Sequence, residues 1–174
     1  MNYRNAVVCC VVILSAASLG AAQSSSGNES PTMSSHHTGV NQRGDRVMGF
    51  SHGKTTHHFR LFADGGAIQV EANDPQDKAS IDQIRTHLTH IAQMFASGDF
   101  NAPMLIHDRV PPGVPTLQRL KDAVSYRFEK TERGGVVHIA TQNKEALEAV
   151  HDFLRFQITD HQTGDPLQIE ELKR

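Results

Sequence analysis

Apolar residues recur at helical spacing in two long segments of the chain, and the two segments resemble each other. Residues 81–99 and 147–165 align without a gap, and both end in Gly-Asp. In residues 81–99 the apolar side chains fall three or four positions apart, which places them on one side of a helix. We therefore predict two amphipathic helices that present similar apolar faces to a common core.

A β-hairpin is predicted immediately before the first helix. Residues 57–62 and 67–72 are rich in strand-forming side chains, and Ala63-Asp64-Gly65-Gly66 lies between them. Asp-Gly supplies the positive φ that a tight hairpin turn requires. Asp77 or Ser80 is expected to cap the helix that follows.

The same order of elements recurs in the second half of the chain. Residues 124–130 and 136–141 flank a turn that contains Gly134-Gly135, and Asn143 is the expected cap of the second helix. The order ββα-ββα predicts an α+β fold. We expect a duplicated unit, with one four-stranded antiparallel sheet and both helices on one face of it.

The segment between the two units, residues 100–120, is expected to be a long connection. Its run of Pro111-Pro112-Gly113-Val114-Pro115 is incompatible with a helix or an inner strand. We predict an extended segment over residues 103–107 and a short helix over residues 117–123. Loops of this length within one domain are often functional.

The beginning of the chain predicts export. Residues 1–22 contain Arg4, an apolar run and small residues at the end, a pattern typical of a cleaved signal peptide; an uncleaved anchor is the alternative. Residues 23–45 are rich in Ser, Gly and Asn and predict a disordered spacer. We expect residues 46–168 to form a single α+β domain and residues 169–174 to be a frayed tail. The predicted location is periplasmic or secreted.

Charge and cysteine content exclude several classes of function. Both cysteines, Cys9 and Cys10, fall in the predicted signal peptide, so a mature chain has no thiol for a disulfide or a metal. The formal net charge of the whole chain is −2, and Lys and Arg do not cluster. We therefore expect neither a nucleic-acid partner nor, after signal cleavage, a membrane partner.

The first helix carries a candidate metal-binding group on the flank of its apolar stripe. His87, His90 and Met94 are three, four and seven residues apart, and neighbours at such spacings on a helix can share one ion. Imidazole suits copper and zinc, and a thioether favours Cu(I). The alternative is a polar helix flank on which Met94 covers the edge of the core.

Three further histidines are candidate ligands outside this helix. His57 and His58 lie on a predicted strand, where alternation sends them to opposite faces, so only one can join the helix site. His107 precedes the Pro-rich segment. His161, by contrast, falls on the apolar stripe of the second helix, and a buried structural role is the favoured interpretation there.

Other functions have weaker support. No Gly-x-Ser-x-Gly motif or phosphate-binding glycine loop is present, so nothing in the sequence favours an enzyme. We predict a histidine-rich metal-binding protein, with copper ahead of zinc. The alternatives are a metal-free interaction module that forms a homodimer or binds a partner and, less favoured, haem held beside Phe153 and Phe156.

Residues 48–74, with the segments 87–115 and 153–165, resemble a family of small exported bacterial proteins of uncharacterised function. Members often carry the label aspartate carbamoyltransferase. The Ser-Thr-Arg-Thr loop and the His-Pro-x-Gln motif of transcarbamoylases are absent from this chain. The resemblance therefore implies export and provides no mechanism.

Overall fold

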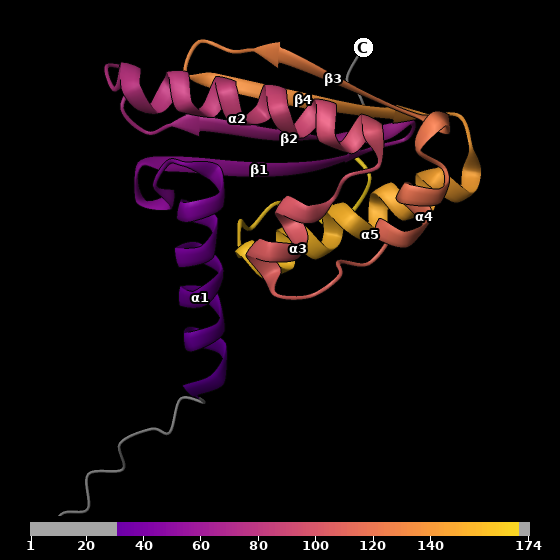
Figure 1. The fold of residues 1–174 in the computed structure, drawn as a ribbon, viewed down its shortest axis with the longest axis horizontal. Helices are drawn as coiled ribbons and strands as arrows, with labels where there is room; N and C mark the ends of the chain where they lie inside the picture. Colours follow the sequence, from indigo (N-terminus) through magenta and orange to yellow (C-terminus); the bar gives the residue numbers. More distant parts are fainter. Residues whose placement is uncertain (1–30, 171–174) are drawn as a thin grey trace, which may run out of the picture.

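The computed structural model describes residues 31–170. Within them the chain forms an α+β fold with a four-stranded antiparallel sheet and five α-helices (Figure 1). This confirms the predicted fold class and the antiparallel sheet. The predicted signal peptide, the start of the expected spacer and residues 171–174 lie outside the described residues.

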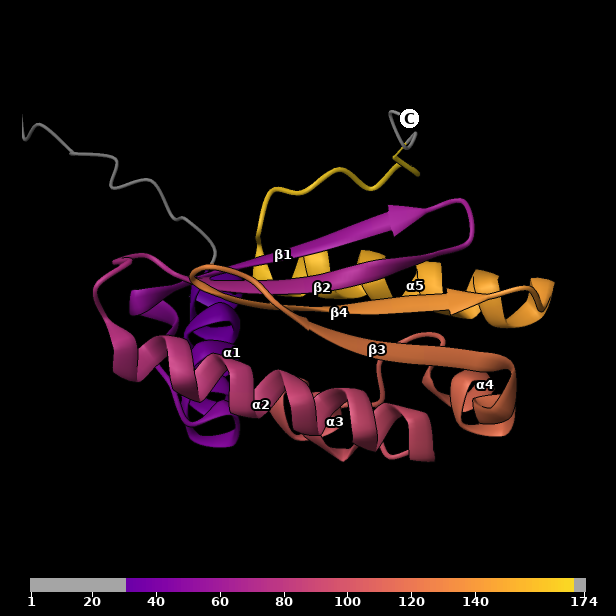
Figure 2. The ribbon, with the colours of Figure 1, turned by 90° about the horizontal axis from the view of Figure 1, so that it is seen from above.

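The sheet is built from two hairpins that meet through their second strands. Its order is β1-β2-β4-β3, which Figure 2 shows side by side. Neighbouring strands are antiparallel throughout, and the central pairing places Ile68 opposite Val137. The strands are β1 (Thr55–Phe62), β2 (Gly65–Ala72), β3 (Val124–Lys130) and β4 (Gly134–Thr141).

Gly65 shows why β2 must begin with a glycine. The turn consists of Ala63 and Asp64, and Gly65 then begins β2 with a φ of 153°. A Cβ atom at this position would lie 1.9 Å from the backbone oxygen of Ile139 on β4. The close approach of β2 and β4 therefore depends on the missing side chain.

The two long helices begin at the predicted caps. The carboxylate of Asp77 accepts a hydrogen bond from the Ser80 amide at the start of α2 (Lys78–Ser97). The Asn143 side chain accepts one from the Ala146 amide at the start of α5 (Lys144–His161). Each bond satisfies a backbone N–H that has no partner within its helix.

Aromatic rings join the two long helices and the connection between them. Both α2 and α5 contact the sheet. Phe95 of α2 stacks on Phe100 with ring centres 4.3 Å apart, and both rings meet the edge of Phe153 on α5 at 5.8 Å. Phe100 and Phe153 are almost fully buried. This cluster fixes how the helices pack against each other.

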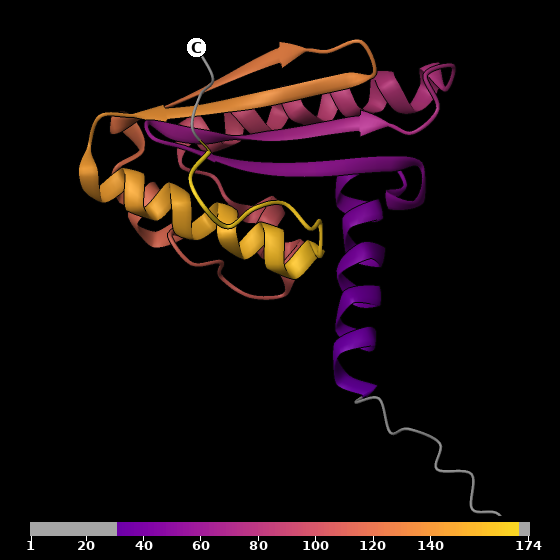
Figure 3. The same cartoon turned by 180° about the vertical axis from the view of Figure 1, so that it is seen from behind.

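Helix α1 (Pro31–Met48) lies where the sequence predicts a disordered spacer. It extends away from the edge of the sheet in Figures 1 and 3 and packs against α3 and α5. Val40 is fully buried, and Arg43 donates a 2.7 Å hydrogen bond from Nε to the Ile106 oxygen. The composition of the segment concealed the helix because these contacts are tertiary.

The connection between the two units is also more helical than expected. Helix α3 (Asn101–His107) replaces the predicted extended segment, and α4 (Val114–Arg119) begins inside the Pro-rich run. A short 3₁₀ helix, η2 (Lys121–Ala123), follows. Pro103 and Pro115 lie in first turns, where the missing N–H has no helical partner to lose.

Candidate functional site

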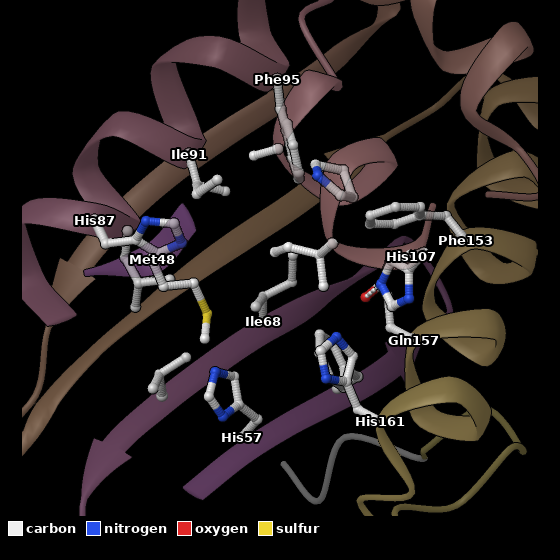
Figure 4. Close-up of a pocket in the computed structure, with 16 residues that line it drawn as sticks. Met48, His57, Ile68, His87, Ile91, Phe95, His107, Phe153, Gln157 and His161 are labelled. Carbon is white, nitrogen blue, oxygen red and sulfur yellow. Dashed lines mark hydrogen bonds between the residues drawn. The ribbon is translucent and has the colours of Figure 1, made fainter. Parts of the chain in front are cut away.

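Four histidines and a methionine line an internal cavity between the sheet and the helices. The cavity has a volume of about 60 Å³, and most of its remaining lining is apolar. Figure 4 shows the labelled side chains converging from β1, β2, α2, α3, α5 and the end of α1. Its polar lining consists of His57, His87, His107, Gln157 and His161, with the sulfur of Met48.

Three of the six predicted ligands line this cavity. They are His57, His87 and His107. His90 is exposed and lines shallow surface hollows instead. Met94 is partly buried against the hydrophobic core and does not line the cavity.

His58 points to the opposite side of β1 from His57, as alternation along a strand requires. Its Nδ1 lies 2.8 Å from Oδ1 of Asp165, and the other oxygen of that carboxylate accepts the Phe59 amide at 3.0 Å. Burial raises the pKa of Asp165, but the bonds from Thr163, Phe59 and His58 outweigh it and lower the pKa overall. His58 therefore fastens the segment after α5 to the sheet.

His57 is the central histidine of the cavity. The imidazole lies 5.0 Å from the ring of His52, 6.0 Å from that of His161 and 6.1 Å from that of Phe50, measured between centres. Its Nε2 is buried and has no hydrogen-bond partner. Burial, followed by the nearby His52 and His87, lowers the pKa of His57 to about 3. The ring is therefore neutral at physiological pH.

His52 is oriented by a carboxylate. Asp45 of α1 lies 2.7 Å from its Nδ1 and also accepts its backbone amide at 2.9 Å. Since a carboxylate accepts, Nδ1 carries the proton, and Nε2 is left with a free lone pair in the neutral ring. That Nε2 is buried and has no partner. The ring fits against α1 because Gly44 has no Cβ, which would lie 2.3 Å from its Cε1.

His161 completes a group of three adjacent imidazoles. The ring lies 5.7 Å from His52, and its Nδ1 is again buried without a partner. Burial, followed by His107, His57 and His52, holds its pKa well below the usual value. Three neighbouring rings thus each present one unpartnered buried nitrogen. An unsatisfied buried polar atom is costly, so three together make this part of the described chain a candidate binding site.

Met48 and His87 form the other side of the cavity. In Figure 4 the sulfur of Met48 lies between the rings of His57 and His87. Phe50 meets His87 edge-on at 5.6 Å. We find no hydrogen bond from the His87 ring to any described residue. Burial, and secondarily His90, lowers its pKa to about 4.

His107 differs from the other cavity histidines because both of its ring nitrogens have partners. Nδ1 lies 2.5 Å from Oδ2 of Asp160, and Nε2 lies 3.0 Å from Oε1 of Gln157. Asp160 also contacts Nε2 of His36 at 3.0 Å and the Arg109 guanidinium at 2.5 Å. His107 is thus tied into a buried polar network that joins α1, α3 and α5.

Electrostatics inside this network favour a neutral His107 beside an ionised Asp160. Burial lowers the pKa of His107 and outweighs its bonds to Asp160 and Gln157, which raise it. Burial raises the pKa of Asp160, but the bonds from His107 and His36 and the charge of Arg109 bring it below its usual range. The network therefore needs the ionised carboxylate.

Among residues 31–170, no group of three or more His, Cys, Asp and Glu side chains stands ready to hold a metal ion. Methionine is outside that set of residue types. No helix in the described part of the chain is long and apolar enough to cross a membrane. Comparison of the chain with protein-family models, curated proteins and solved structures finds no match.

Three residues of the site are not among the six predicted ligands. Met48 and His52 precede β1 within a glycine-rich stretch, and the favoured role for His161 was structural. The detectable signal was compositional, since His52, His57 and His58 occur within seven residues. No pattern in the sequence brings His161 to the same place, because it arrives from the far end of α5.

Proposed function

We propose that this protein binds a metal ion, copper ahead of zinc, in the histidine-lined cavity. The observation that carries the proposal is the set of unpartnered buried nitrogens on His57 and His161, which line the cavity, and on His52, whose ring stacks against both. A metal ion coordinated by neutral imidazoles would satisfy such atoms directly. His57 lies at the centre of the proposed site. The rings of His52 and His161 lie on one side of it, and Met48 and His87 lie on the other.

The ligand types favour Cu(I). The thioether of Met48 is a soft ligand, which selects Cu(I), and zinc sites are built from four N, S or O ligands in a tetrahedron. Cu(I) accepts fewer ligands, so two imidazoles and a thioether are sufficient. With these three ligands, Cu(I) binding does not require a third histidine to reach the same ion.

The size of the cavity supports an ion over haem. A volume of about 60 Å³ accommodates a few small atoms. A haem has a ring system far larger than that. Phe153, which the sequence offered as part of a haem-binding face, is almost fully buried in the aromatic cluster of the core.

His57 and His58 provide a matched test. They are adjacent on β1, and only His57 lines the cavity. We expect His57→Ala to weaken Cu(I) binding by more than the roughly 10- to 100-fold that loss of an outer-shell partner costs. His58→Ala should leave the affinity within about twofold. The measurement is competition with a chromogenic Cu(I) chelator; equal affinities for the two variants would refute the proposal.

A metal-free interaction module is the second candidate function. Leu105 on α3 and Val110 shortly after it are 62% and 55% exposed. Exposed apolar side chains of this size are typical of contact surfaces when they cluster. Light scattering of the purified protein tests this candidate. A dimer that Leu105→Glu dissociates would support it, and a monomer would count against it.

We also propose export and duplication as the setting of this function. The apolar start of the chain supports a cleaved signal peptide and a periplasmic or secreted protein. The repeated order of two strands followed by a long helix, and the contact of Phe95 with Phe153, support two copies of one ββα unit with both helices on one face. N-terminal sequencing of the mature protein tests the cleavage, which we expect near Gln23.

A further inference from the structure

A second hollow lies on the outer side of Met48 and His87. This surface depression has a volume of about 350 Å³ and is formed by the end of α1 and one face of α2. Met48 and His87 line both the depression and the internal cavity. The two side chains therefore lie between this depression and the cavity of the proposed metal site.

The rim of the depression carries groups that attract a hydrated cation. Asp82 is 78% exposed, and its only ion pair among the described residues is a long 3.8 Å contact with Arg85. His90 is exposed and lies one helical turn after His87. His87 and His90 line the same depression. The exposed polar side chains of Asp82 and His90 thus lie on the solvent side. The thioether of Met48 and the imidazole of His87 lie between the depression and the cavity.

We propose that this depression is the port through which the metal ion enters the cavity, with His90 and Asp82 as its first contacts and Met48 and His87 as the inner gate. The inference rests on the proposed function and assigns a role to His90 that differs from that of a ligand in the final site. A port changes how fast the ion arrives and leaves. It does not change how tightly the ion is held at equilibrium.

The test compares rate with affinity in the full mature chain. Cu(I) is supplied as its cationic acetonitrile complex, and its transfer to the protein is followed in a quenched-flow mixer by adding bicinchoninate after set delays, which captures the copper that is not yet bound. We expect His90→Ala/Asp82→Asn to slow transfer by about tenfold, within the one to three decades over which association rates vary in a mutant series. The equilibrium affinity should remain within about twofold of wild type.

Two further variants make the result specific. His138→Ala/Asp152→Asn removes the same two residue types from other parts of the surface and should leave the transfer rate unchanged. Thr86→Lys places a positive charge at the port and replaces none of the proposed ligands. It should slow the transfer of a cation to the protein. Thr86 is exposed, so this variant is expected to fold.

The outcomes separate the two proposals. Equal transfer rates for all variants, with tight binding intact, would overturn the port and leave the metal site. A large loss of equilibrium affinity in His90→Ala/Asp82→Asn would also overturn the port, because it would make these residues ligands. Absence of Cu(I) binding in the wild type would overturn the proposed function itself.

Discussion

The imidazoles of His52 and His57 are nearly parallel, inclined by 19° with centres 5.0 Å apart, and each has a buried nitrogen without a partner. A proton on His52 disfavours a proton on His57, and this effect adds to that of burial. Asp45 fixes the proton of His52 on Nδ1. Burial and the neighbouring His52 therefore keep His57 neutral, and a neutral imidazole is the form that can coordinate a metal ion.

The thioether of Met48 should determine which metal the site prefers. Replacing Met48 with Leu keeps volume and hydrophobicity, so the fold should lose less than about 1.5 kcal/mol. We expect Cu(I) affinity to fall at least about tenfold, which is about 1.4 kcal/mol. Zn(II) affinity should change little, because zinc sites use other ligands. Competition titrations with both ions provide the measurement.

Met94 provides the matched control for this substitution. It lies on the same helix as His87 but does not line the cavity. Met94→Leu should therefore leave the affinities for both ions within about twofold of wild type. If Met94→Leu weakens Cu(I) binding as much as Met48→Leu does, the thioether ligand has been assigned to the wrong residue.

The low pKa of His57 predicts acid sensitivity of the apo fold. The unfolded chain binds this proton near pH 6.5, whereas the folded chain binds it near pH 3. Between these values the unfolded state holds more protons, so the free energy of unfolding falls as pH falls. His57 contributes about 1.4 kcal/mol per pH unit in that window and nothing above it.

Substitution of His57 isolates this contribution. His57→Gln should reduce the slope of unfolding free energy against pH, measured by urea denaturation between pH 4 and 6.5, by about 1.4 kcal/mol per unit. A constant loss of stability in the variant does not affect the slope. The control His90→Gln changes an exposed histidine of α2. Identical slopes for wild type and His57→Gln would show that His57 titrates normally in the fold.

Local signals made most of the fold predictable. Asp77 and Asn143 cap their helices through bonds within three residues, and paired glycines mark where β2 and β4 begin. Alternation alone placed His57 and His58 on opposite sides of β1. Each of these features depends on a few neighbouring residues, which the sequence displays directly.

The site was only partly predictable, because the distances between side chains in the folded chain do not follow from the spacing of residues in the sequence. His90 is rotated by about 60° from His87 on an α-helix and faces the surface. Met94 returns near the direction of His87 but lies about 10 Å further along the axis. The thioether that reaches the cavity belongs instead to Met48, at the end of a helix that forms through tertiary contacts.

Asp160 should be the most sensitive carboxylate for stability. It joins His36 of α1, His107 of α3 and Arg109, and its side chain is only 7% exposed. Asp160→Asn leaves these donors without their charged acceptor, and we expect a loss of about 2–3 kcal/mol in urea denaturation. Asp152→Asn, on the exposed side of α5, should cost under about 0.5 kcal/mol. Similar losses for both variants would contradict the central role of the network.

Gly113 and Gly164 separate steric crowding from backbone strain. Both have a positive φ, of 80° and 77°, so alanine at either position costs about 1–2 kcal/mol from conformation alone. A Cβ at Gly113 would also lie 2.1 Å from the backbone oxygen of Ala149 on α5, whereas a Cβ at Gly164 would have no neighbour within 4 Å. Gly113→Ala must therefore push the start of α4 away from α5.

We expect Gly113→Ala to destabilise the fold by at least about 1 kcal/mol more than Gly164→Ala, measured by thermal or urea denaturation at neutral pH. The excess reports how tightly α4 is held against α5, because a loosely packed α4 would move aside at little cost. Equal losses of stability in the two variants would show that α4 moves aside and is packed loosely against α5. Cu(I) affinity should remain near that of wild type in both variants, since neither glycine lines the cavity.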